Sequence, residues 1–187
     1  MTVKFMINKL NNLLANLPNH KRSEIGGVSL VKEAFSQETI LNYHFGMAIL
    51  SESSFHTIFF NNNNFYGSYF FECQFHNCIF TKTIFSKAEW SDCTFINCQF
   101  DECVFERTEV DTTIFQSCNF TNVNFIGSSI YECTFQDCLF KKLKTTPNKT
   151  LLMCIINSKF YKEKDQKTIL LNNESDFLKI LNEMKAF

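Results

Sequence analysis

The chain has 187 residues, a length typical of a single domain, and its composition excludes several classes of protein. Hydrophobic residues make up 45% and charged residues 20% of the chain, and no run of about 18 apolar residues is present to cross a membrane. The formal net charge of −1 is not that of a nucleic-acid-binding protein. The unusual counts are 23 Phe and 9 Cys beside only 5 Gly and 2 Pro, and they indicate a repeat built on Phe.

Residues 1–17 predict a short amphipathic helix that stops before Pro18. Its apolar residues recur at helical spacing: Phe5, Met6, Leu10, Leu13, Leu14 and Leu17. Two interpretations are open, a lid over the apolar end of the fold and a membrane anchor. The lid is favoured because repeat proteins need capped ends. Residues 25–31 predict an edge strand that leads into the repeat.

The middle of the chain has a period of five residues. From residue 55 to residue 140 every fifth residue is apolar, and fifteen of these eighteen residues are Phe. The exceptions are Trp90, Val110 and Ile130, which recur every twenty residues. Two residues before each central residue the side chain is mostly small, and eight of the nine cysteines occupy this position.

A period of five fits neither a helix nor a long strand, but it fits a short strand followed by a corner. Residues two apart on a strand point to the same side, so the small residue and the Phe both point inward. Such short segments need equivalent segments about 4.8 Å above and below them to satisfy their backbone polar groups. The twenty-residue recurrence of non-Phe residues predicts four segments in each coil of a solenoid.

These residues resemble a known family. Residues 73–107, which read CQFHN-CIFTK-TIFSK-AEWSD-CTFIN-CQFDE-CVFER, are similar to the pentapeptide-repeat proteins. The resemblance implies an all-β solenoid, a right-handed quadrilateral β-helix, here with short helical caps at both termini. We expect an N-terminal cap over residues 1–47, the β-helix over residues 48–142, and a C-terminal cap over residues 143–187.

The C-terminal cap is predicted to contain a helix that begins at Asn173 or Ser175. Its apolar stripe consists of Phe177, Leu178, Leu181 and Met184. Two roles stay open for this helix, sealing the last coil and pairing with a second copy of the chain. The resemblance implies the second role, because gyrase-targeting members of the family form a homodimer through a C-terminal module.

Cysteine and histidine residues suggest no metal site in this sequence. Cys73, His76 and Cys78 follow the spacing of the repeat rather than that of a zinc motif, and the thiols are expected to point inward among Phe rings. No signal peptide is recognisable, so free thiols in a reducing, cytoplasmic compartment are expected. We find no catalytic motif, and we expect no enzyme activity, no metal and no cofactor.

Acidic residues gather on one face when the twenty-residue period is applied. Residues 48–140 carry eleven acidic and three basic side chains, and both ends of the chain are basic. Seven of these acids fall on the face that contains Leu50, Phe70 and Trp90, with no Lys or Arg among them: Glu52, Glu72, Glu89, Asp92, Glu109, Asp111 and Glu132. Tyr69, Phe71 and Tyr131 are expected to point outward beside them, as aromatic residues of binding surfaces do.

Two functions follow, in addition to a simple role of the acids in solubility. The first is a non-catalytic protein whose acidic face imitates DNA. The resemblance to quinolone-resistance and microcin-immunity members implies DNA gyrase or topoisomerase IV as its partner, and immunity or antibiotic tolerance as its effect. The second is a general interaction scaffold, such as a regulator or effector, whose specificity lies in the non-repeat ends. Neither function requires direct binding to nucleic acid or to a membrane.

Overall fold

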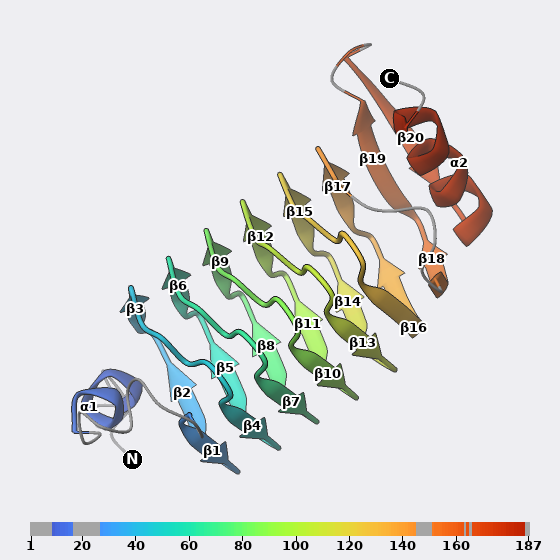
Figure 1. The fold of residues 1–187 in the computed structure, drawn as a ribbon. Helices are drawn as coiled ribbons and strands as arrows, with labels where there is room; N and C mark the ends of the chain where they lie inside the picture. Colours follow the sequence, from blue (N-terminus) through green and yellow to red (C-terminus); the bar gives the residue numbers. More distant parts are fainter. Residues whose placement is uncertain (1–8, 17–26, 145–150, 163, 165, 186–187) are drawn as a thin grey trace, which may run out of the picture.

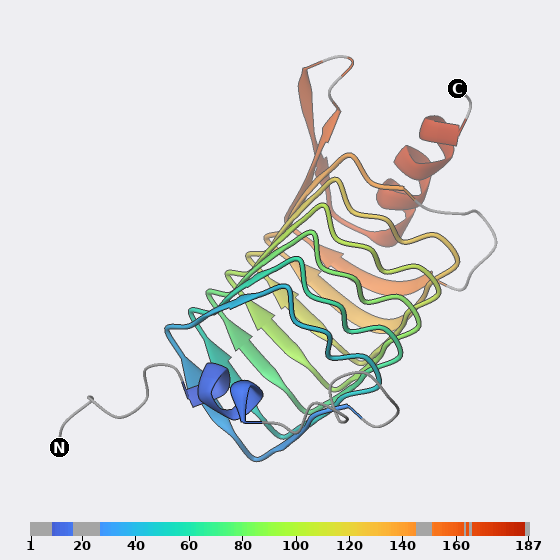
Figure 2. The same cartoon turned by 60° about the vertical axis from the view of Figure 1, so that its left-hand side comes forward.

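A computed structural model describes residues 9–16, 27–144, 151–162, 164 and 166–185. The chain winds into a four-sided parallel β-helix with a short helix at each end (Figures 1 and 2). The predicted fold class, a quadrilateral β-solenoid with helical caps, is therefore confirmed. Parallel pairing joins residues twenty apart, as Trp90 pairs with Phe70 and Val110, which confirms four segments per coil.

Each wall of the β-helix is a stack of short strands, one from each coil (Figure 1). The first wall contains β1 (Ser29–Val31), β4 (Ile49–Ser51), β7 (Tyr69–Phe71), β10 (Glu89–Ser91), β13 (Glu109–Asp111) and the start of β16 (Ser129–Gln136). The second wall contains β2 (Ala34–Ser36), β5 (Ser54–His56), β8 (Gln74–His76), β11 (Thr94–Ile96), β14 (Ile114–Gln116) and the end of β16. The third wall contains β3 (Thr39–Leu41), β6 (Phe59–Asn61), β9 (Ile79–Thr81), β12 (Gln99–Asp101), β15 (Asn119–Thr121), β17 (Leu139–Lys141) and β19 (Ser158–Lys162). The fourth wall is held by single bridges between residues 44, 64, 84, 104, 124 and 144.

The chain turns at each corner on a residue with positive φ. Asn77 and Asn97 have φ of 54°, and Gly67 has φ of 64°. Asn and Gly adopt this left-handed backbone most readily, whereas other residues pay about 1–2 kcal/mol for it. Many corners nevertheless carry charged residues, such as Glu72 and Asp92. The side chain at these corners points to solvent, so the residue type there affects the charge of the surface and not the packing of the core.

Aromatic rings fill the interior in columns. On the third wall, Phe100 stacks between Phe80 and Phe120 with ring centroids 5.0 and 4.9 Å apart. Neighbouring columns meet edge to face, as Phe95 meets Phe100 at 5.6 Å and 61°. Both arrangements are favoured by the ring quadrupole, and they add to the burial of apolar area. The core is therefore a continuous lattice of rings rather than a set of separate contacts.

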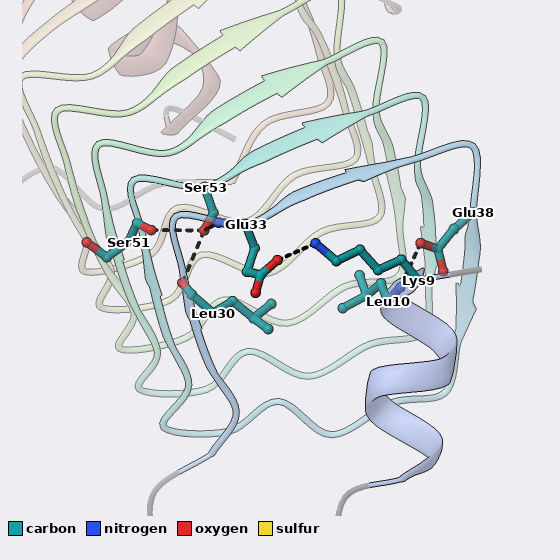
Figure 3. A network of polar contacts seen from close by, with 7 residues as sticks. All are labelled: Lys9, Leu10, Leu30, Glu33, Glu38, Ser51 and Ser53. Carbon is teal, nitrogen blue, oxygen red and sulfur yellow. Dashed lines mark hydrogen bonds and ion pairs between the residues drawn. The ribbon is translucent and has the colours of Figure 1, made fainter. Parts of the chain in front are cut away.

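The small inward residues hydrogen-bond to the backbone of the coil below. The Ser53 hydroxyl donates to the Leu30 carbonyl at 3.2 Å and accepts from the Glu33 N–H at 3.1 Å (Figure 3). Cys78 Sγ occupies the equivalent place, 3.4 Å from the Phe55 carbonyl. A buried hydroxyl or thiol without a partner is costly, and this carbonyl accepts its hydrogen, so a small side chain with a donor is tolerated at this position. This contact explains why Cys, Ser and Thr recur there beside Ala.

The β-helix begins one coil earlier than the boundary expected at residue 48. β1, β2 and β3 pair in parallel with β4, β5 and β6, so residues 28–47 form the first coil. Its buried inward residues include Val28, Leu30 and Ile40. The period of five continues through this coil, but Leu30 and Ile40 conceal it because they replace Phe.

Helix α1 (Lys9–Ala15) lies at the N-terminal end of the coil (Figure 2). Leu10 and Leu14 are buried against the core and Leu13 packs beside them, so the lid interpretation is the one that the structure supports. The buried carboxylate of Glu38 accepts a hydrogen bond from the N–H group of Leu10 at 2.8 Å (Figure 3). It also accepts one from the N–H group of Asn11 at 2.8 Å. Among the described residues no helix is long and apolar enough to cross a membrane. Phe5, Met6, Leu17 and residues 25–26 of the predicted edge strand lie outside the described residues.

Acidic residues hold this lid where no further coil lies below. Glu33 and Glu38 occupy positions that hold small inward side chains in later coils. Glu33 pairs with the Lys9 ammonium, and Glu38 caps the first turn of α1 (Figure 3). A carboxylate at a helix N-terminus accepts hydrogen bonds from the unpaired N–H groups. Its negative charge also interacts favourably with the positive end of the helix dipole.

The C-terminal end continues the coil beyond the boundary expected at residue 142. β18 (Leu151–Ile156) pairs with β16, β19 pairs with β17, and β20 (Lys167–Leu171) returns antiparallel to β19. Helix α2 (Glu174–Lys185) follows, and the Asn173 side chain accepts the Asp176 N–H at 2.9 Å as its cap. This confirms Asn173, rather than Ser175, as the capping residue.

Helix α2 seals the last coil. The Phe177 ring lies 5.1 Å from that of Phe140, and Phe177 and Ile180 are buried. Leu178 is half-buried, and the side chains of Leu181 and Met184 are outside the described set. Ile180 is absent from the predicted apolar stripe, although it is buried. Pairing with a second copy stays a prediction.

Replacing one interior ring is expected to cost much more stability than replacing an outward ring. Phe100→Ala removes a fully buried ring from two stacks and should lower the free energy of unfolding by about 3–5 kcal/mol. Phe59→Ala, on the outer side of the third wall, is the matched control and should cost less than about 1.5 kcal/mol. Urea unfolding followed by circular dichroism measures both. Equal losses would contradict the lattice of interior rings.

Removing the Glu38 carboxylate is expected to release the N-terminal lid. Glu38→Ala leaves the first N–H groups of α1 without their buried acceptor and should lower the free energy of unfolding by about 1–3 kcal/mol. Amide hydrogen exchange over residues 9–16 should accelerate. Glu52→Ala at an exposed corner is the control. Unchanged protection of α1 in the Glu38 variant would show that the helix is held by its leucines alone.

Candidate binding surface on the first wall

The structure places all seven predicted acids on the outer side of the first wall or at its corner with the second wall. Glu89, Glu109 and Asp111 lie on β10 and β13, and their side chains are exposed. The other four occupy the positive-φ corner, where they are also exposed: Glu52, Glu72, Asp92 and Glu132. The coil thus brings together residues that are up to eighty positions apart in the chain.

Carboxylates of like charge lie next to each other in this arrangement. Glu89 pairs in register with Glu109, and Asp111 pairs with Ser91 directly beside Asp92. Neighbouring strands are about 4.8 Å apart, so these charges repel one another. A row of acids in this register lowers stability rather than raising it, which makes a role in packing a poor explanation for it.

Basic residues border the acidic row, which corrects the prediction that no Lys or Arg joins it. Lys32 occupies the same corner column one coil before Glu52, and its Nζ lies 3.4 Å from Glu52 Oε2. The prediction is wrong here because the first coil was assigned to the N-terminal cap. Lys87 and Arg107 lie at the opposite corner, between the fourth wall and the first. The acidic field is therefore confined to a strip along the wall.

The three predicted aromatic residues do point outward. Tyr69 and Tyr131 are exposed, and Phe71 is half-buried with its ring 6.3 Å from that of Tyr69. A hydrogen bond with Glu132 raises the pKa of the Tyr131 hydroxyl, and the charges of Glu132 and Asp111 add to this effect. Tyr131 therefore keeps its proton in the negative field of the wall and can donate a hydrogen bond.

Sequence reasoning missed several apolar residues on the same wall. Ile49 and Val31 point outward from β4 and β1, and Met47 and Tyr66 extend the apolar area around the corner to the fourth wall. These residues lie in the N-terminal coils, below Glu89 and Glu109. A comparison of the outward positions alone, coil by coil, would have found them.

Cysteine and histidine residues do not converge on a metal. Cys73 and Cys78 are buried, whereas His76 lies on the outer side of the second wall, where its ring stacks on that of His56 with centroids 6.2 Å apart. Within the described part of the chain no group of three or more His, Cys, Asp and Glu residues is arranged to hold a metal ion. Eight described cysteines are free thiols, as predicted.

The fold and its surface define a solenoid repeat protein with four chemically distinct walls. Residues 68–145 match the family model described as the pentapeptide repeat region. This stretch of the chain is therefore a pentapeptide repeat region, and the resemblance stated from the sequence is confirmed. No curated protein matches the chain.

Solved structures of similar fold are distant in sequence. A pentapeptide repeat protein from the thylakoid lumen of Arabidopsis thaliana is 19% identical with a TM-score of 0.42, over 54% of this chain and 67% of that one. A pentapeptide repeat protein from the cyanobacterium Cyanothece 51142 is 15% identical with a TM-score of 0.40, over 76% and 99% of the two chains. QnrB1, a plasmid-mediated fluoroquinolone resistance protein, is 12% identical with a TM-score of 0.35, over 87% and 99%.

Buried thiols predict a loss of stability at alkaline pH. Burial raises the pKa of Cys103 and of Cys133 to about 12, above the ordinary thiol value. The folded state therefore holds these protons more tightly than the unfolded state, and stability should fall as pH rises from about 9 toward 12. Replacing both residues by Ser, which supplies the same donor at Ser53, should make this fall shallower. Thermal melts between pH 8 and pH 11 measure it, and identical slopes for the parent and the double variant would contradict the assignment.

Proposed function

We propose that the first wall is the binding surface of a non-catalytic protein, and that its partner is a protein with a basic, DNA-handling surface. A type II topoisomerase, DNA gyrase or topoisomerase IV, is the partner that the resemblance implies, with immunity or antibiotic tolerance as the outcome. The observation that carries this proposal is the register of the acids, in which Glu89 and Glu109 lie side by side on the exposed wall. A row of like charges attracts a cationic partner and speeds its association.

The position of the acids supports binding better than solubility alone. Four of the seven occupy corners with φ between 50° and 54°, where Asn would be less strained: Glu52, Glu72, Asp92 and Glu132. The second wall, by contrast, has Asn77 and Asn97 at its far corner and only Asp137 as an acid among its described outward residues. Solubility would be served by acids on any wall, so their concentration on one wall favours a partner.

Charge reversal on the wall should abolish an effect on topoisomerase activity. Glu89, Asp92, Glu109 and Asp111 are replaced together by Lys, and supercoiling by purified DNA gyrase is measured at low salt with and without a fluoroquinolone. The parent protein is expected to inhibit the enzyme or protect it from the drug. The quadruple variant should be weaker by about tenfold or more.

Four other acids of the β-helix provide a matched control. Asp101, Glu102, Glu106 and Asp137 lie on the other walls or their corners, and their replacement by Lys changes the net charge equally. This control should act like the parent. Absence of any effect of the parent protein would contradict the topoisomerase proposal, and equal losses in the two variants would show that only net charge matters.

A second candidate surface lies at the C-terminal end, as the scaffold hypothesis requires. Lys141 Nζ lies 5.4 Å from the Tyr161 ring, and Lys159 and Lys167 are exposed on the adjoining hairpin. Deletion of residues 143–187 would remove α2 and uncap the last coil, so point changes are the better test. If Lys159→Glu with Lys167→Glu removes partner binding and the acidic quadruple variant retains it, specificity lies in this end.

A further inference from the structure

The first wall is divided chemically along the axis of the β-helix. The strands of its N-terminal coils point Val31, Ile49, Tyr69 and Phe71 outward, whereas the strands of the next two coils point Glu89, Glu109 and Asp111 outward. Glu52 and Glu72 lie at the corner beside the apolar strands. Register pairing places Ile49 below Tyr69 and Tyr69 directly below Glu89. The change from apolar to acidic therefore occurs between β7 and β10, within one surface.

The apolar half forms a continuous patch. Ile49 is 49% exposed and Tyr69 38% exposed, and Met47 and Tyr66 continue the patch across the corner. Gly67 lies above Met47, and a Cβ at Gly67 would approach Met47 Sδ to 2.7 Å, so glycine keeps the methionine in place. Exposed apolar residues are ordinary when scattered, but a contiguous group marks an interaction site. The second and third walls carry one large exposed apolar residue each among the described residues, Ile114 and Leu41.

A strand cannot add to this wall, because its backbone is already paired between coils. The N–H of Tyr69 donates to the Ala48 carbonyl at 2.8 Å, and that of Glu89 donates to the Ser68 carbonyl at 2.9 Å. A partner must therefore bind through side chains. Strands of three residues give a wall about 10 Å wide, which matches the diameter of an α-helix.

The spacing of the coils also suits a helix that lies along the axis. Coils recur about every 4.8 Å, close to the 5.4 Å pitch of an α-helix, so each helical turn can contact one coil. The distance from Val31 to Asp111 is four coil steps, about 19 Å, which about 13 helical residues span. A basic helix would be repelled by Lys87 and Arg107 at one corner of the wall. It would be attracted by Glu72 and Asp92 at the other corner, so it would lie toward the acidic side.

We infer that the first wall binds an amphipathic α-helix of a protein partner, with the helix's apolar end on the Ile49–Tyr69 patch and its basic end on the acids of β10 and β13. The inference rests on the proposal that this wall is the binding surface. It differs from imitation of a DNA duplex, because a phosphate row would require acids along the whole column that Glu89 and Glu109 share with Ile49 and Tyr69. The apolar half supplies affinity that salt does not weaken. The acidic half orients the helix and raises its association rate.

Two synthetic helical peptides of about 18 residues test this inference. The block peptide has leucines on one face of its first half and lysines on the same face of its second half. The mixed peptide has the same composition, with leucine and lysine alternating along that face. Fluorescence anisotropy at low and at moderate salt measures binding to the full-length protein. The block peptide is expected to bind at least about tenfold more tightly, and equal binding of the two peptides would overturn the inference.

Substitutions in each half separate the two contributions. Ile49→Ser with Tyr69→Ser should weaken binding of the block peptide about tenfold at both salt concentrations. Its matched control, Ile114→Ser with Leu41→Ser on other walls, should change binding less than about twofold. Glu109→Gln with Asp111→Asn should weaken binding mainly at low salt. An equal effect of the Ile49–Tyr69 pair and its control would overturn the inference.

The same variants distinguish this inference from the proposed topoisomerase function. If the Ile49–Tyr69 pair leaves gyrase inhibition intact while charge reversal removes it, the wall binds by charge alone and the inference is wrong. If the block peptide binds as expected and gyrase is unaffected by the parent, the inference stands and the partner is another protein. A dimer in sedimentation that the Ile49–Tyr69 pair dissolves would assign the wall to a second copy and would also overturn the inference.

Discussion

The structure depends on the hydrogen bonds that hold each residue over the residue twenty positions away. These bonds run from coil to coil, as from the Gln74 N–H to the Ser53 carbonyl at 2.9 Å, and they satisfy backbone groups that three-residue strands could not satisfy alone. Because the register repeats without a shift from β4 to β13, like residues form columns. Ring stacks inside and charge rows outside are two results of one constraint.

The interior and the surface respond to this constraint independently. Inward positions accept rings at the centre of each segment and small donors such as Cys78 two residues before it, so their identities are set by packing. Outward positions lie outside the ring lattice, so packing of the core does not set their identities. The composition of a wall is therefore informative: the first wall places Glu89 beside Glu109 at a cost in stability, whereas the second wall stacks His56 under His76 among uncharged residues.

The repeat made much of the fold predictable from sequence. The period of five and the twenty-residue recurrence of Trp90, Val110 and Ile130 were sufficient to predict four walls and to place seven acids on one of them. The first coil was missed because Leu30 and Ile40 replace Phe, and because Glu33 and Glu38 stand at inward positions that face α1 instead of another coil. Such exceptions occur where the repeat ends. The periodic pattern does not identify the element that packs against the first coil in place of another coil.

The candidate surface was only partly predictable for a different reason. Charge is conspicuous in a sequence, so the acids were found, but Lys32 was hidden by the misplaced first coil. The sequence does not distinguish Ile49, Met47 and Tyr66 from the other hydrophobic residues, which make up 45% of the chain. Their outward direction is known only once the register is known. Once that register is known, the outward residues of its strands divide the first wall into an apolar half and an acidic half.

The register of the first wall can be tested by one stability measurement. Glu109→Lys puts a positive charge directly beside Glu89, so it should raise the free energy of unfolding in urea by about 0.2–1 kcal/mol. Glu106→Lys on the fourth wall, which is stacked between Ser86 and Ile126, should give no such gain. A loss of stability in Glu109→Lys, or an equal change in both variants, would mean that the acids do not share a wall, and the binding surface described here would not exist.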